Sequence, residues 1–197
     1  MVNPNLTELV FIIDASGSMY SLKETIITSF NELIEEQKKL TSECHVTLVT
    51  FSDETKIIYD NENIQSINEL TTSNYITDGY TALFDAIGTT IDTVGKRLSI
   101  TQEDNRPGNV LVFIMTDGED NKSKIFNFDK IKEMITLQTD TYNWKFTYTC
   151  ATPTQKDVGI SMGIPYSTAI PQTNKGYTGM MRDVTRSITN IRTSTVH

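Results

Sequence analysis

The sequence has few of the residues that build imidazole or thiolate chemistry. Its 197 residues include two histidines and two cysteines. His197 is the last residue, which leaves His45 as the one histidine expected inside an ordered element. A zinc site rich in histidine or a serine–histidine–aspartate relay would have to be built on that single imidazole. Two cysteines are too few for a disulfide framework, so the chain is expected to work in a reducing compartment, the cytoplasm.

Long apolar runs and an excess of positive charge are also missing. No stretch approaches the roughly 18 apolar residues of a membrane span, and the polar start, residues 1–8, does not resemble a secretory signal. The 25 acidic residues against 17 basic ones give a net charge of −8, which disfavours nucleic acids and anionic membranes as partners. The length and an apolar fraction of 38% fit one soluble domain, 1–197, with a core of about residues 8–192.

Apolar strands alternate with amphipathic helices along the chain. Two short and wholly apolar runs, Leu9–Ile13 and Val110–Met115, are typical of strands that are buried on both faces of a parallel sheet. The break Ser52–Glu54 joins two strands as an antiparallel hairpin. The other elements are strands at 45–51, 55–59, 144–150 and 166–170, helices at 21–40, 81–98, 129–139, 157–162 and 174–191, and a helical turn near 66–70. This order predicts an α/β sandwich with a mostly parallel sheet and one antiparallel edge strand.

Three polar clusters stand at comparable places in this pattern. Asp14, Ser16 and Ser18 follow the first apolar strand, Asp117 follows the second, and Thr81 opens a predicted helix. Because the carboxyl ends of parallel strands meet at one edge of a sheet, the two carboxylates and three hydroxyls are expected to converge there. Oxygen ligands without nitrogen or sulfur favour Mg²⁺ or Mn²⁺, with Ca²⁺ as a further alternative. Two carboxylates leave a divalent ion electrophilic, so an incoming anionic oxygen would complete its coordination.

Together these clusters resemble the metal-ion-dependent adhesion site (MIDAS) of von Willebrand factor type A (vWA) domains, in the parts Asp14-x-Ser16-x-Ser18, Thr81 and Asp117-Gly118. The resemblance spans about residues 8–170. It implies a doubly wound, Rossmann-like, three-layer fold of about six strands with the third antiparallel. It also implies a metal held directly or through water by the five residues, with an acidic side chain of a partner at the open position. The patterns at 79–86 and 116–119 are most similar to small stand-alone bacterial and bacteriophage members.

Some of these residues have a plainer alternative role. Asp14 and Ser16 are of the types preferred as helix N-caps, a role that needs no metal. Asp85, on the helix after Thr81, either supports the ligands or caps a nearby turn. Asp120 either tunes the metal or belongs to a solvated loop.

Four residues beside the ligand loops are predicted to form the rim of a partner-binding surface: Tyr20, Gly79, Tyr80 and Glu119. Tyrosine is enriched at protein interfaces, which favours that role for the two aromatic side chains. The alternatives are ordinary half-buried tyrosines and a solvated acid.

A full set of oxygen ligands without a catalytic base beside it favours a metal-dependent protein-binding module over an enzyme. The predicted partner is an unidentified protein that offers Asp or Glu to the metal. One alternative is a Mg²⁺-dependent phosphoesterase, because such sites can also use an aspartate at a strand end. Against it, Ser16 stands where a second carboxylate would be needed, and no Gly-Lys-Ser/Thr phosphate loop is present. An oligomeric structural or regulatory subunit is the third hypothesis, with the oligomeric state left open.

Overall fold

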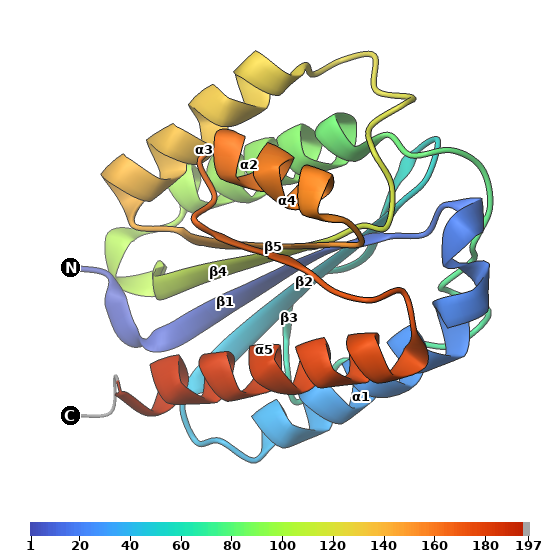
Figure 1. Ribbon diagram of the computed structural model, residues 1–197. Coiled ribbons are helices and arrows are strands. Elements are labelled where there is room, and N and C mark those ends of the chain that lie inside the picture. The colour runs from blue at the N-terminus through green and yellow to red at the C-terminus, as the bar shows by residue number, and fades with distance from the viewer. Residues whose placement is uncertain (195–197) are drawn as a thin grey trace.

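A six-stranded sheet forms the middle layer of the protein (Figure 1). The computed structural model describes residues 1–194, and His197 lies outside them. The strand order is β3-β2-β1-β4-β5-β6, and every neighbouring pair is parallel except β2 with β3. The strands are β1 (Asn3–Asp14), β2 (Glu43–Phe51), β3 (Thr55–Asn63), β4 (Pro107–Met115), β5 (Lys145–Cys150) and β6 (Tyr166–Ala169). The predicted fold class, a mostly parallel sheet with one antiparallel edge strand, is confirmed.

Helices cover both faces of the sheet. Figure 1 shows α2, α3 and α4 on one face, and α1 and α5 on the other. Their bounds are α1 (Lys23–Lys38), α2 (Leu83–Ile100), α3 (Phe128–Tyr142), α4 (Pro153–Ser161) and α5 (Asn174–Ser194). Two 3-10 turns, Gly17–Leu22 and Glu103–Asn105, precede α1 and β4. None of the helices in residues 1–194 is long and apolar enough to cross a membrane.

Strand β1 is buried on both faces, which explains its unbroken apolar run. Leu9, Phe11 and Ile13 pack into the core beneath α1 and α5. Val10 and Ile12 pack into the second core, beneath α2 and α3. Successive side chains of a strand point to opposite faces, so a central strand between two helical layers needs apolar residues at every position.

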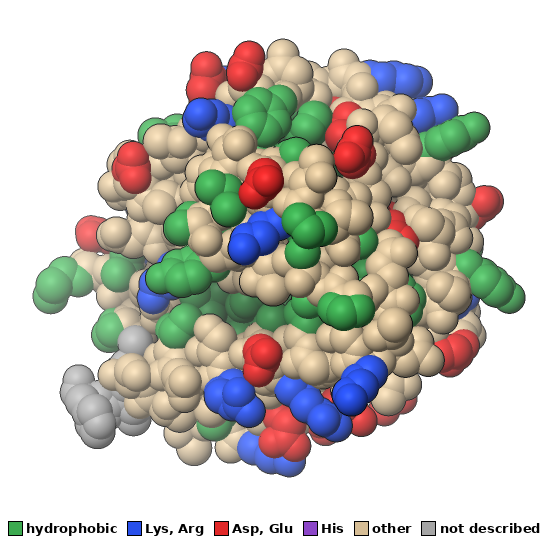
Figure 2. All heavy atoms as spheres, in the orientation of Figure 1, with side chains coloured by type: hydrophobic (Ala, Val, Ile, Leu, Met, Phe, Trp, Pro, Cys, Tyr) green, Lys and Arg blue, Asp and Glu red, His purple; other side chains and the backbone are tan. Residues whose placement is uncertain are grey.

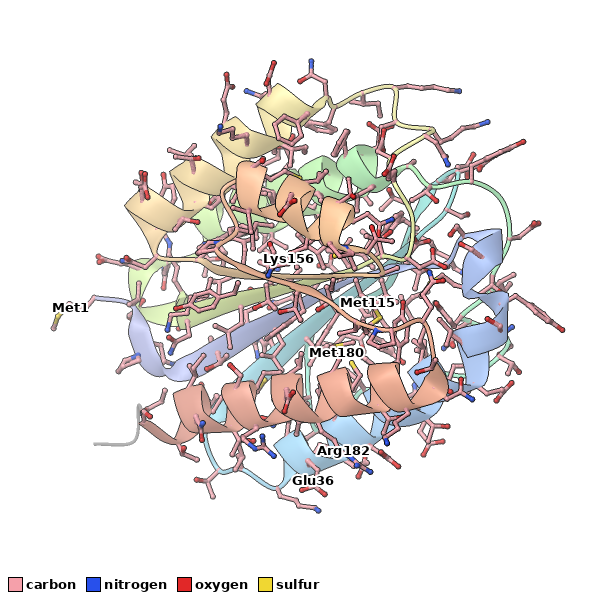
Figure 3. All side chains as sticks on the ribbon, in the orientation of Figure 1. Met1, Glu36, Met115, Lys156, Met180 and Arg182 are labelled. Carbon is pink, nitrogen blue, oxygen red and sulfur yellow. The ribbon has the colours of Figure 1, made fainter. Side chains whose placement is uncertain are left out.

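Helix α5 is fixed to the sheet by packing and to α1 by hydrogen bonds. Met180 of α5 and Met115 of β4 point toward one another between the helix and the sheet (Figure 3). The buried Arg192 donates to the backbone carbonyl of Gln37, in the last turn of α1, at 2.8 Å and to that of Ser42, just beyond the helix, at 2.7 Å. The C-terminal helix is therefore an integral part of the fold.

A groove of about 880 Å³ lies between α5 and the neighbouring faces of β5 and β6. Phe113 and Thr147 of the sheet and Val184 of α5 line it. It is visible as the hollow with apolar side chains at its base in Figure 2.

Two predicted helical segments are corrected by the structure. The segment 66–70 is not a helical turn, because the Asn31 side chain bonds both the amide and the carbonyl of Leu70, at 2.8 and 2.9 Å. The helix expected at 157–162 starts earlier, at Pro153, where a capping box of Thr152 and Gln155 satisfies the first amides.

The arrangement of β1 and β4 creates the edge at which the predicted ligands meet. The two strands are parallel neighbours at the centre of the sheet, and Ile13 pairs with Met115 in register. Their carboxyl ends therefore lie side by side, at the right of Figure 1 where β1 passes into the first 3-10 turn. Asp14 ends β1, and Thr116 and Asp117 directly follow β4.

Candidate metal centre

The carboxylate of Asp14 is fixed in place by neighbours on two strand ends. The side chain is fully buried. One carboxylate oxygen accepts a hydrogen bond from the Ser16 amide at 2.7 Å, and the other accepts from the Thr116 hydroxyl at 2.6 Å. Ser16 precedes the 3-10 turn, but its side chain makes no capping bond there. Ser16 therefore occupies the N-cap position of this turn without a capping side-chain bond, and the Asp14 carboxylate bonds the Ser16 amide just before the turn.

A chain of hydroxyl groups links the two carboxylates. Ser16 Oγ lies 3.1 Å from Ser18 Oγ, and Ser18 Oγ donates to Asp117 Oδ1 at 2.7 Å. Ser16 and Asp117 are buried, whereas Ser18 is exposed. Four of the five predicted ligands thus form one cluster that opens to solvent at Ser18.

Thr81, the fifth predicted ligand, approaches the cluster from another loop. Its backbone is held at both ends by Asn121, whose side chain accepts from the Thr81 amide at 2.9 Å and whose amide donates to the Thr81 carbonyl at 3.0 Å. A methyl group placed on Gly118 would stand 3.2 Å from Thr81 Oγ1, so the hydroxyl lies directly beside the residue that follows Asp117. Helix α2 begins at Leu83, which places Thr81 in the loop before the helix and not within it.

Burial makes the two carboxylates costly to ionise in the absence of a cation. Burial raises the pKa of Asp14, against the hydrogen bonds from Thr116 and Ser16, and the negative charge of Asp117 adds to the rise. Burial likewise raises the pKa of Asp117, against the hydrogen bond from Ser18. Among residues 1–194, neither carboxylate forms an ion pair. Two like charges therefore face one another without a basic side chain between them.

Several residues that support the cluster were not predicted from the sequence. The buried Tyr75 donates to the Asp14 carbonyl at 2.6 Å. Gln155 and Gln172 both donate to the Asp117 carbonyl, at 3.1 and 3.4 Å. Only Thr116 had a local signal, because its hydroxyl stands at the strand end beside Asp117. The other three come from distant loops and helices, and no spacing in the sequence points to them.

The predicted rim residues are exposed and lie close in sequence to the predicted ligands. The side chains of Tyr20 and Tyr80 are 74% and 60% exposed, and Gly79 and Glu119 are exposed as well. Gly79 has a φ of +77°, and a Cβ there would stand 2.9 Å from a carboxylate oxygen of Asp53. The positive φ favours glycine at this position, and a larger residue would also displace the Asp53 carboxylate.

Asp85 and Asp120 support the loop that follows β4. The Asp85 carboxylate accepts from the amides of residues 124, 125 and 126, at 2.8 to 2.9 Å. The Asp120 carboxylate accepts from the Phe84 amide at 3.2 Å and the Ser123 hydroxyl at 2.5 Å. Both side chains therefore cap backbone segments, which answers the question that the sequence left open for Asp85.

The donors in the cluster fit a hard cation. They are two carboxylates and three hydroxyls, and no group of three or more His, Cys, Asp or Glu side chains gathers anywhere in the described part of the chain. His45 is at the opposite edge of the sheet, where its ring lies 3.0 Å from the Asn61 side chain. Two buried carboxylates with neutral hydroxyl oxygens beside them are a ligand set that suits a divalent ion bound by oxygen atoms.

Comparisons with known proteins agree with this fold. The family model of the von Willebrand factor type A domain matches residues 8–146. No curated protein matches the chain significantly.

Among solved structures, a mutant of the PilB minor pilin from Streptococcus sanguinis has a TM-score of 0.67 at 12% identity, over 96% of this chain and 62% of the pilin chain. A von Willebrand factor type A protein from Catenulispora acidiphila has a TM-score of 0.57 at 15% identity, over 91% of this chain and 42% of that one. Proximal thread matrix protein 1 from the mussel byssus, in a structure with a zinc-occupied MIDAS motif, has a TM-score of 0.61 at 13% identity, over 92% and 45%. The chain thus spans about two fifths to three fifths of these proteins, and at such identities the likeness concerns the fold.

Proposed function

Because the chain belongs to the von Willebrand factor type A domain family, we propose that its cluster of aspartates and hydroxyls binds a divalent metal and presents it to an acidic side chain of a protein partner. Domains of this family commonly bind protein partners. The metal is expected to be Mg²⁺, with Mn²⁺ and Ca²⁺ as alternatives. The residues that would hold it are Asp14, Ser16, Ser18, Thr81 and Asp117.

The observation that carries this proposal is the pair of buried carboxylates that no basic side chain among residues 1–194 neutralises. Asp14 and Asp117 are 0% and 7% exposed, and burial raises the pKa of both. A fold gains nothing in stability from two buried like charges, since each loses its hydration without a partner. A bound divalent ion would supply the missing positive charge, which supports a metal-binding role for the pair.

The hydroxyl ligands explain why such a metal would attract a partner. Ser16, Ser18 and Thr81 contribute oxygen atoms without charge. The negative charges of the two carboxylates therefore equal the charge of a divalent ion and do not exceed it. A carboxylate from a partner then binds more favourably than it would at a site with three or four acidic ligands. Because Ser18 is the exposed member of the cluster, a partner is expected to approach the cluster from the side of Ser18.

The rim residues are proposed to contact the partner around that point. Tyr20 and Tyr80 offer large exposed aromatic surfaces, and Gly79 and Glu119 flank them. Aromatic side chains at the edge of a charged contact exclude water from it, which strengthens the electrostatic attraction.

Metal binding is tested by titrating MgCl₂, MnCl₂ and CaCl₂ into the metal-free protein in a calorimeter. The wild type should bind one ion, and Asp14→Asn should bind none while keeping its circular dichroism spectrum. Asp140→Asn, which changes an exposed aspartate of α3, is the matched control and should bind as the wild type does. Equal binding by Asp14→Asn and the wild type would contradict the proposed site.

Capture of a protein partner is the second test. Proteins retained from the native source by the immobilised wild type should be released by EDTA, and the Asp14→Asn protein should not retain them. Retention that survives both EDTA and the substitution would overturn the proposal. Hydrolysis of a generic phosphoester that requires Mg²⁺ and is lost in Asp14→Asn would favour the phosphoesterase alternative.

A further inference from the structure

Three large apolar side chains stand exposed on the loops around the candidate metal centre. They are Tyr20, Ile76 and Tyr80, with 74%, 59% and 60% of their surface exposed. Tyr20 lies in the 3-10 turn that follows Ser16 and carries Ser18, and Tyr80 directly precedes Thr81. We call these three side chains the apolar rim.

The two loops that carry the apolar rim are joined by backbone hydrogen bonds at the cluster itself. The Gly17 amide donates to the Gly79 carbonyl at 3.1 Å, and the Asp78 amide donates to the Ala15 carbonyl at 2.9 Å. Next to Ile76, the buried Tyr75 donates to the carbonyl of Asp14. The apolar rim is therefore carried by the same two hydrogen-bonded loops that hold Ser16, Ser18 and Thr81.

The ring of Tyr80 is held in position before any partner arrives. Its amide donates to Asp53 Oδ1 at 2.6 Å, and the ammonium of Lys122 lies 4.6 Å from the ring centroid. The same ammonium is 3.8 Å from Asp53 Oδ2. The hydrogen bond fixes the backbone of Tyr80, and the contact with Lys122 limits the motion of its ring, which reduces the side-chain entropy lost when a partner covers it.

The charges of the same loops disfavour a partner with many acids. Asp78 and Glu119 are exposed, and in the described part of the chain neither forms an ion pair. Lys122, the basic residue over Tyr80, is already beside Asp53. Beside the predicted metal, a second or third acid on the partner would therefore meet the negative charges of Asp78 and Glu119, whereas Lys124, further along the loop after β4, is exposed and forms no ion pair among residues 1–194.

We propose that this surface selects a single Asp or Glu set among bulky apolar residues in the partner, with the acid directed to the metal and its neighbours packed on Tyr20, Ile76 and Tyr80. This inference rests on the proposed metal-dependent function and specifies the chemistry of the partner. Segments rich in acids but poor in apolar residues should be poor ligands, although they offer more carboxylates.

A selection from short randomised peptides tests the inference. The peptides are displayed on phage, bound to the immobilised wild type in MgCl₂ and eluted with EDTA, and the Asp14→Asn protein serves as the background. The enriched peptides should contain one Asp or Glu with a bulky apolar residue within a few positions. For the best synthetic peptide, Tyr80→Ala should weaken binding about tenfold or more, because anchor side chains at the centre of an interface carry that much.

Control variants separate this inference from the proposed function. Tyr142 is 60% exposed, as Tyr80 is, but it lies at the far end of α3, so Tyr142→Ala should bind the peptide as the wild type does. Tyr80→Ala should also keep the heat of MgCl₂ binding. The inference would be overturned if the enriched peptides were acidic but had no excess of apolar residues, or if Tyr80→Ala bound the peptide as tightly as the wild type does. Either result would leave the proposed metal site unaffected. Peptides without an acid, release that does not need EDTA, or no enrichment over Asp14→Asn would count against the proposed function and the inference together.

Discussion

Replacing Asp14 by asparagine should stabilise the metal-free protein, although it removes a residue of the candidate site. The substitution keeps the shape of the side chain and removes a buried charge that has no cation in the described structure. The amide oxygen can still accept from the Ser16 amide. The Thr116 hydroxyl, which now donates to Asp14, has an alternative acceptor in the Gly118 carbonyl at 3.2 Å and can then accept from the new amide.

The size of the effect follows from the contacts of the carboxylate. Burying an unpaired charge costs several kcal/mol. The two hydrogen bonds to the carboxylate offset this cost by about 1.5–3 kcal/mol each. The same bonds to a neutral amide contribute about 0.5–1.5 kcal/mol each, without that penalty. We expect Asp14→Asn to raise the free energy of unfolding by about 1–2 kcal/mol. For a chain of this size the melting temperature should rise by about 2–8 °C.

The effect should depend on pH in a defined direction. Burial raises the pKa of Asp14 in the native state above its ordinary 3.8, so the native state binds the proton more tightly than the unfolded chain does. The stability that this proton provides is complete below about pH 3.8 and is lost as the pH rises through the native pKa. The advantage of Asp14→Asn should therefore be absent in acid and reach its full size near neutral pH.

Divalent metal should reverse the order of the two proteins. An ion at 100 times its dissociation constant stabilises the folded state by about 2.7 kcal/mol, and only the wild type should gain this. Urea and thermal unfolding at pH 7, in EDTA and in MgCl₂, measure both differences. The reasoning is refuted if Asp14→Asn is the less stable protein in EDTA, or if MgCl₂ stabilises both proteins equally.

Three further predictions concern buried groups near and far from the centre. Tyr75→Phe should lower the free energy of unfolding by about 1–2 kcal/mol, because it removes the hydrogen bond to the Asp14 carbonyl. Tyr177→Phe should be neutral or stabilising in the same urea titration, because its buried hydroxyl has no hydrogen-bond partner among residues 1–194. Arg97→Ala should destabilise by about 3–5 kcal/mol, since it leaves the buried Glu8 without its cation, and MgCl₂ affinity in the calorimeter should stay unchanged. A loss of affinity equal to that of Asp14→Asn would show that the last change acts on the whole fold.

The sequence predicts the fold correctly where the evidence lies within a short stretch of consecutive residues. The apolar runs of β1 and β4 identify central parallel strands by themselves, because only a strand covered on both faces needs apolar residues at every position. Once two such strands are neighbours, their carboxyl ends must meet, and this is why Asp14 and Asp117 could be placed together before the structure was known. The order of elements then placed Thr81 near the same edge.

The supporting contacts could not be predicted because they join distant parts of the chain. Tyr75 is 61 residues from the Asp14 carbonyl that it binds, and Thr116 is 102 residues from the Asp14 carboxylate. An aspartate at position 85 is suited both to supporting the ligands and to capping a turn. Only the position of the loop at 124–126, whose amides donate to it, shows that it caps this loop. The segment 66–70 has a helical composition, but contacts with Asn31 hold it in another conformation.

Strand β1 contains two buried acids with different surroundings. In the middle of the strand, Glu8 is 1% exposed, and its carboxylate is neutralised by Arg97 and accepts from the Thr47 hydroxyl. At the carboxyl end, Asp14 is equally buried and next to Asp117, yet its neighbours are amides and hydroxyls. The same strand therefore shows that this fold can place an arginine against a buried carboxylate when stability alone requires it. At Asp14 it places a backbone amide and a hydroxyl instead, so the charge of this carboxylate is not paired with a basic side chain among residues 1–194.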